Sequence, residues 1–129
     1  MRRRLPAQAA VEFALTVPVL LLLILGVVDA GRGVVAAISL NNAAREGARY
    51  VAVHLNDGTC GSVGCQSEAQ TIVDNTAQGI DTSQISFTLS TSGGIVSLAL
   101  TCPFQPVSPM IEATFGRPTL VASTTMRAR

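Results

Sequence analysis

The sequence contains few charged and aromatic residues, and no tryptophan. Of its 129 residues, 13% are charged and 4% aromatic, and nine arginines against eight acidic residues leave a net charge of +1. Such a balance provides no basic surface of the kind that binds nucleic acid. No phosphate-binding glycine loop, nucleophile elbow or carboxylate pair surrounds the single histidine, His54. We therefore expect no nucleic-acid partner, no catalytic residues and no cofactor.

Hydrophobic residues are abundant and are concentrated near the N-terminus. They make up 48% of the chain, and no charged residue occurs in residues 13–28. Residues 9–28 would form about twenty residues of helix, roughly 30 Å long, which is the thickness of the hydrocarbon core of a bilayer. The sequence therefore predicts one membrane-spanning helix.

The charges that flank this segment predict its orientation. Arg2, Arg3 and Arg4 precede it and Asp29 follows it, so the positive-inside rule places the N-terminus in the cytoplasm. We expect a single-pass protein of the cytoplasmic (inner) membrane with an extracytoplasmic C-terminal domain. The alternative is a cleavable secretory signal, to which residues 28–30 conform. Glu12, between the arginines and the apolar run, argues against that alternative.

The helical pattern continues beyond the predicted span. Apolar or small residues recur at steps of three and four along one stripe, namely Leu40, Ala44, Gly47, Ala48, Val51 and Leu55. Arg45, Glu46 and Arg49 lie on the opposite side, where Glu46 can pair with Arg49. We expect one amphipathic helix that runs from the span to about His54.

The remaining residues predict a small α+β domain. A second helix is expected from Ser67 to near Gly79, followed by antiparallel strands over residues 85–90 and 95–102 with a turn at Gly93 and Gly94. Residues 119–126 are expected to add a third strand, after a proline-rich loop with a helical turn at 110–114. The predicted organisation is a basic leader (1–7), a transmembrane helix (8–30), its extracytoplasmic continuation (31–55) and the small α+β domain (56–129).

Three cysteines in an exported domain indicate one disulfide and one remaining thiol. Cys60 and Cys65 enclose a short flexible loop and are the favoured pair, while Cys102 is the alternative partner or a buried thiol. A zinc site at His54, Cys60 and Cys65 would lack a fourth ligand and an apt spacing. We expect no metal site.

Several motifs closely resemble the TadE-like family, the minor pilins or pseudopilins of the bacterial tight-adherence (Tad) pilus. They are residues 7–15 (AQAAVEFAL), 29–32 (DAGR), 41–50 (NNAAREGARY), 102–104 (CPF) and 120–127 (LVASTTMR). The resemblance implies an adhesive-pilus assembly role. The implied partners are other pilin or pseudopilin subunits of the Tad machinery, the membrane and a prepilin peptidase.

The resemblance also implies a processing site. Cleavage between Ala7 and Gln8 would make Glu12 the fifth mature residue, followed by Phe13, although the family usually has glycine where Ala7 stands. Glu12 would then be able to pair with the new N-terminal amine of a neighbouring subunit, and Arg45, Glu46 and Arg49 are further candidate assembly residues. The alternative hypothesis is a bitopic anchor whose exported domain binds a partner without entering a pilus.

Overall fold

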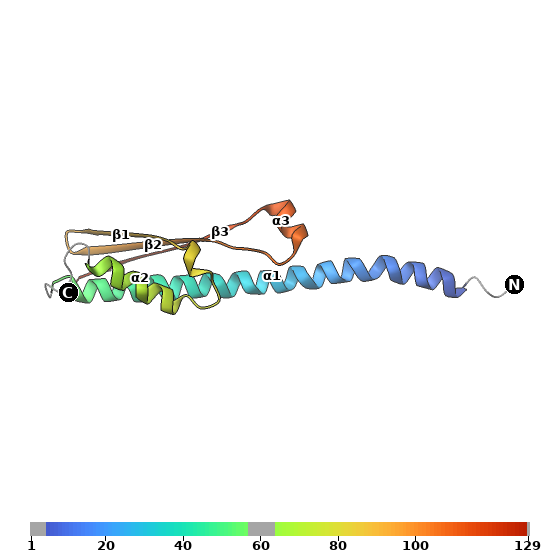
Figure 1. Ribbon diagram of the computed structural model, residues 1–129, viewed down its shortest axis with the longest axis horizontal. Coiled ribbons are helices and arrows are strands. Elements are labelled where there is room, and N and C mark those ends of the chain that lie inside the picture. Colours follow the sequence, from blue (N-terminus) through green and yellow to red (C-terminus); the bar gives the residue numbers. More distant parts are fainter. Residues whose placement is uncertain (1–4, 57–63, 129) are drawn as a thin grey trace.

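In the computed structural model, one long helix carries a small domain along its C-terminal half (Figure 1). The structure describes residues 5–56 and 64–128. Helix α1 runs without interruption over Leu5–His54 and includes Pro18; its length is about 75 Å at 1.5 Å per residue. The predicted continuation of the helix to about His54 is confirmed.

A three-stranded antiparallel sheet lies against the C-terminal half of α1. Its strands are β1 (Ser86–Ser92), β2 (Ile95–Pro103) and β3 (Thr119–Arg127), in the order β1-β2-β3. Gly93 and Gly94 connect β1 to β2 with φ angles of 57° and 74°, which a two-residue type I′ turn requires and which glycine adopts without steric cost. The predicted sheet, including its third strand, is confirmed.

The core lies between this sheet, α1 and helix α2 (Gly64–Thr76). Alternation along β2 turns one set of side chains inward, and the predicted stripe of α1 faces them. The residues with at most 1% exposure include Leu40, Ala44, Ala48 and Val51 of α1, Ala69 and Val73 of α2, and Val96, Leu98, Leu100 and Cys102 of β2. The α+β fold predicted from the sequence is thus confirmed.

The short elements differ in detail from the prediction. Helix α2 begins at Gly64 and ends at Thr76, a few residues before the predicted boundaries at each end. A 3-10 helix, η1 (Thr82–Gln84), was not expected; its N-cap residue Asp81 accepts a hydrogen bond from the Ser83 N–H. The proline-rich connection between β2 and β3 contains helix α3 (Pro109–Phe115), slightly longer than the predicted turn.

Candidate functional site

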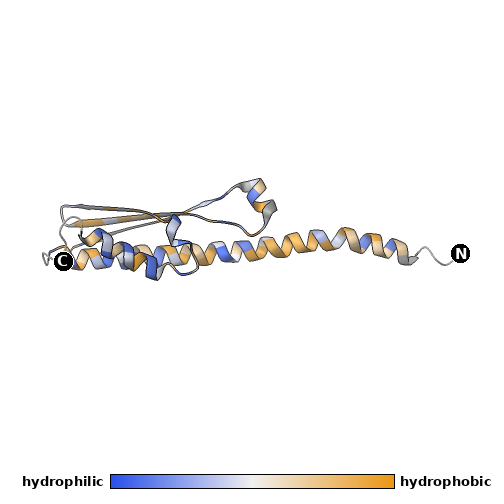
Figure 2. Cartoon of the chain, viewed as in Figure 1, coloured by the Kyte–Doolittle hydropathy of each residue, from blue (hydrophilic) through white to orange (hydrophobic). Residues whose placement is uncertain are grey.

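The N-terminal half of α1 presents an apolar surface that nothing in the domain covers (Figure 2). Side chains such as Phe13 and Leu15, each 70% exposed, project from it all round. The helix is long and apolar enough to cross a membrane, and it contains an apolar stretch of 18 residues of which none is buried. This surface is consistent with a membrane anchor.

The predicted processing residues lie on the first turns of this exposed helix. Ala7, Gln8, Glu12 and Phe13 are all solvent-exposed in the single chain. The Thr16 hydroxyl donates a 2.8 Å hydrogen bond to the carbonyl of Glu12, but within residues 5–56 and 64–128 the Glu12 carboxylate has neither a hydrogen bond nor an ion pair. The arrangement leaves this carboxylate available to a second molecule.

The predicted polar group near the far end of α1 is also exposed. Arg49 Nε lies 3.9 Å from Glu46 Oε1, with side chains 72% and 54% exposed, and Arg45 lies one turn before Arg49. An exposed pair at this distance contributes little to stability. The structure therefore presents Arg45, Glu46 and Arg49 on the surface, and their role in assembly stays a prediction.

A contact that the sequence analysis missed centres on Asp29. This side chain is only 3% exposed, and its two carboxylate oxygens accept hydrogen bonds from the backbone N–H groups of Val107 (2.9 Å) and Ser108 (2.8 Å). Arg32 Nη1 lies 3.3 Å from the same carboxylate. Asp29 thereby holds the loop before α3 against α1 at the end of the predicted span.

Aromatic packing reinforces this attachment. The Arg32 guanidinium lies 5.8 Å from the centre of the Phe104 ring, within the range of a cation–π interaction. A Cβ atom at Gly33 would lie 3.8 Å from the same ring, so the ring packs directly on the helix backbone. Residues 29–32 are one of the motifs that resemble the TadE-like family, but nothing in this motif indicates that it contacts the loop before α3.

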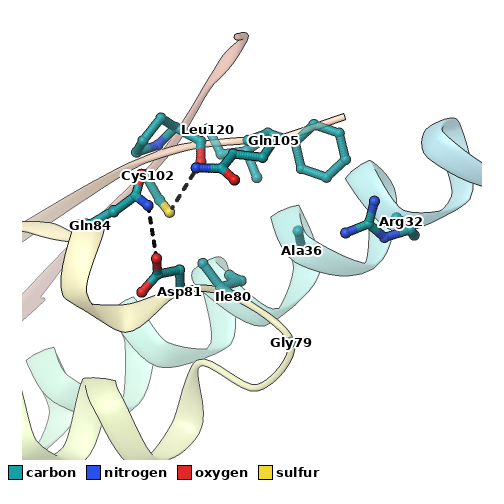
Figure 3. A pocket seen from close by; sticks show the side chains of 11 residues that line it. Arg32, Ala36, Gly79, Ile80, Asp81, Gln84, Cys102, Gln105 and Leu120 are labelled. Carbon is teal, nitrogen blue, oxygen red and sulfur yellow. Dashed lines mark hydrogen bonds between the residues drawn. The ribbon is translucent and has the colours of Figure 1, made fainter. Parts of the chain in front are cut away.

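A cavity of about 150 Å³ lies beside this contact, between α1, η1 and the end of β2 (Figure 3). Gln84 Nε2 donates to Asp81 Oδ2 over 2.8 Å at its wall. Hydrogen bonds from Ser83 and Gln84 lower the pKa of Asp81 below its usual value. Cys102 also lines the cavity; burial, followed by the nearby negative charge of Asp81, raises the pKa of its thiol.

Two of the three cysteines lie within the described residues. Cys102 is a free, buried thiol, which is one of the two states that the sequence left open for it. Cys65 is buried. Cys60 lies outside the described residues, so no disulfide has both ends within the described part, and the Cys60–Cys65 pairing stays a prediction. Within that part, no group of three or more histidine, cysteine, aspartate or glutamate side chains is arranged to hold a metal ion.

The single histidine belongs to a polar cluster at the end of α1. The Tyr50 hydroxyl donates a hydrogen bond to the Glu68 carboxylate of α2, and this bond raises the pKa of Tyr50. The ring of His54 stacks on that of Tyr50 with centres 4.2 Å apart, and its Nδ1 lies 2.9 Å from the Tyr50 carbonyl. These contacts join α2 to the last turn of α1.

Most of the long helix is similar to a known protein family. Residues 7–49 match the model of the family described as TadE-like protein, so this segment is TadE-like, as the resemblance predicted. The match ends within α1 and includes Glu12, Asp29 and the group around Arg45. No curated protein and no solved structure matches the chain.

Proposed function

We propose that this chain is a minor pilin-like (pseudopilin) subunit that acts in assembly of a Tad-type adhesive pilus, rather than an enzyme. The observation that carries the proposal is the TadE-like match over residues 7–49, a segment that forms a continuous and largely uncovered helix. The similarity of this segment to that family suggests a protein associated with the Tad pilus. The role of a minor pilin is more specific than this association and is our proposal.

The proposed arrangement in the membrane follows from charge and length. Residues 8–30 span the cytoplasmic membrane with residues 1–7 inside, residues 31–55 continue the helix outside, and residues 56–129 form the exported domain. The arginines at positions 2–4 support this orientation. After assembly the subunit would reach the pilus or the cell surface.

Glu12 is the proposed assembly determinant. An ionised carboxylate among hydrocarbon chains is costly unless it finds a partner, and no group in the described part of its own chain pairs with it. A neighbouring subunit's N-terminal amine, released by a prepilin peptidase between Ala7 and Gln8, would supply the opposite charge. Phe13 is the residue that follows Glu12 in this processing region.

The test is the mature N-terminus of the protein purified from its own host. Intact mass and N-terminal sequence should show that residues 1–7 are lost and that Gln8 is first. Loss of residues 1–30 would indicate an ordinary signal peptide. An N-terminus at Met1 or Arg2 would favour the alternative, a bitopic anchor whose exported domain binds a partner outside a pilus.

A further inference from the structure

The connection between β2 and β3 forms a projecting tip, residues 104–118, that lies beside the membrane-proximal part of α1 (Figure 1). We propose that this tip is an interfacial anchor, which inserts at the boundary between headgroups and acyl chains of the membrane that α1 spans. This inference rests on the proposed membrane span. It adds a second lipid-binding element, within the domain itself.

The position of the tip along α1 is the first argument. Asp29 binds the backbone of Val107 and Ser108, so the tip is fixed at the level of residue 29. A hydrocarbon core of about 30 Å that starts at residue 9 ends near residue 28. The tip therefore lies at the outer boundary of the hydrocarbon region, with no stalk between domain and membrane.

An apolar cavity between the tip and α1 is the second argument. Its volume is about 310 Å³, and it is lined by Gly26, Ala30 and Gly33 of α1 and by Phe104, Pro106, Ile111 and Pro118 of the tip, with Asp29 and Leu120. Gly26 is part of the predicted span, on the order of 3 Å inside its outer boundary. One wall of the cavity is thus continuous with the lipid-facing surface, and the end of an acyl chain can fill it.

Several backbone N–H groups of the tip have hydrogen-bond partners within the protein. Irregular backbone near lipid must find its hydrogen-bond partners within the protein. The N–H groups of Val107 and Ser108 donate to Asp29, that of Phe104 donates to the Pro118 carbonyl over 2.8 Å, and those of Ile111 and Glu112 donate to the Ser108 carbonyl. The prolines of the tip have no N–H to satisfy.

The charges of the tip are balanced as well. Its only two charged side chains are Glu112 and Arg117, and Arg117 Nε donates to Glu112 Oε1 over 2.8 Å. Val107, which is 58% exposed, provides an apolar side chain at the surface. Paired charges and a backbone that is hydrogen-bonded within the protein lower the cost of placing the tip at the boundary of the hydrocarbon. The opposite end of the domain carries Arg45, Glu46 and Arg49.

The absence of tryptophan allows a direct test in the full-length chain, reconstituted in vesicles of phosphatidylcholine and phosphatidylglycerol that contain brominated lipid as a quencher. Three single-tryptophan variants are compared. Val107→Trp probes the tip, Val53→Trp is the matched control because Val53 is similarly exposed (53%) at the far end of the domain, and Leu23→Trp reports the span.

The expected result is that Leu23→Trp and Val107→Trp lose emission intensity with brominated lipid, Val107→Trp most with bromines near the headgroups, while Val53→Trp is unaffected. Quenching at position 23 but not at position 107 overturns the tip proposal and leaves the span intact. A short-wavelength emission at position 107 without lipid quenching also overturns it, because a protein surface then covers the tip. No quenching at position 23 refutes the span and the tip proposal together.

Discussion

At the scale of single residues, Asp29 links the membrane-proximal part of α1 to a distant loop. In the sequence it is the acidic residue that follows an apolar run. In the structure it is buried and supplies acceptors for two backbone N–H groups almost eighty positions away in the chain. A buried carboxylate that accepts two such bonds is satisfied, and the donors, which would otherwise be unpaired, are satisfied with it.

Replacement of Asp29 should therefore release the tip. In Asp29→Ala, the N–H groups of Val107 and Ser108 lose their acceptor, so we expect their amide hydrogen exchange to become faster than in the wild-type protein. Asp74→Ala, which removes an exposed carboxylate from α2, is the matched control and should leave both rates unchanged. Unchanged exchange in Asp29→Ala would show that the carboxylate does not hold the tip.

At the scale of the elements, α1 meets both α2 and the sheet at Gly47. A Cβ atom at this position would lie 2.9 Å from Val73 Cγ2 and 3.0 Å from Leu98 Cδ2. Both distances are shorter than ordinary contacts, and the β-branched side chain of Val73 has little freedom to move away. The absence of a side chain at Gly47 thus sets how closely the three elements pack.

Gly47→Ala should consequently destabilise the domain even though alanine favours helix. Overpacking of a core costs about 1–3 kcal/mol, whereas alanine gains about 1 kcal/mol of helix propensity over glycine. Gly31→Ala is the matched control, because a Cβ atom at Gly31 has no neighbour within 4 Å. Thermal unfolding in detergent should give a lower melting temperature for Gly47→Ala than for Gly31→Ala, and equal values would contradict the close-packing argument.

The cap of η1 should make a small, pH-dependent contribution to stability. Hydrogen bonds from Ser83 and Gln84 lower the pKa of Asp81 below its usual 3.8. The stabilisation is therefore complete above that value and is lost as the pH falls through the folded-state pKa. The difference in unfolding free energy between wild type and Asp81→Ala should be present at neutral pH and should vanish in acid; because Asp81 is exposed, we expect it to be modest. A difference that persisted in acid would mean that the charge of Asp81 is not responsible.

Elements could be predicted from the sequence where the pattern that specifies them lies within a few neighbouring residues. The alternation of Val96, Leu98 and Leu100 and the glycine pair after β1 predicted the hairpin, because both patterns lie within a few residues of the structure they specify. The end of α1 near His54 followed from helical periodicity in the same way. The attachment of Asp29 to Val107 could not be predicted, because it depends on where the sheet places a distant loop.

At the scale of the whole molecule, the domain covers one end of α1 and leaves the other end uncovered. The buried positions of α1 begin at Asp29 and recur as far as Ala52, whereas large side chains of the N-terminal half such as Val11, Leu15 and Val19 are more than half exposed. Folding of the domain and insertion of the uncovered helix therefore involve different residues. Glu12 lies in the uncovered half, far from every buried contact.

Substitution of Glu12 should for this reason separate insertion from assembly. Glu12→Ala removes a charge that is costly in lipid, so the helix should insert at least as well as the wild type. An alkaline phosphatase fusion after Val53 should be active in both proteins, because the proposed orientation places the domain outside. The variant should nevertheless be lost from sheared surface fractions of the host, because the proposed partner of the neighbouring N-terminal amine is missing. Arg45→Ala alters an exposed residue outside the span. Its amount in the sheared fraction tests separately the assembly role predicted for Arg45, Glu46 and Arg49. Wild-type amounts of Glu12→Ala in the sheared fraction would refute the pairing between subunits, and an inactive fusion in the wild-type protein would refute the orientation.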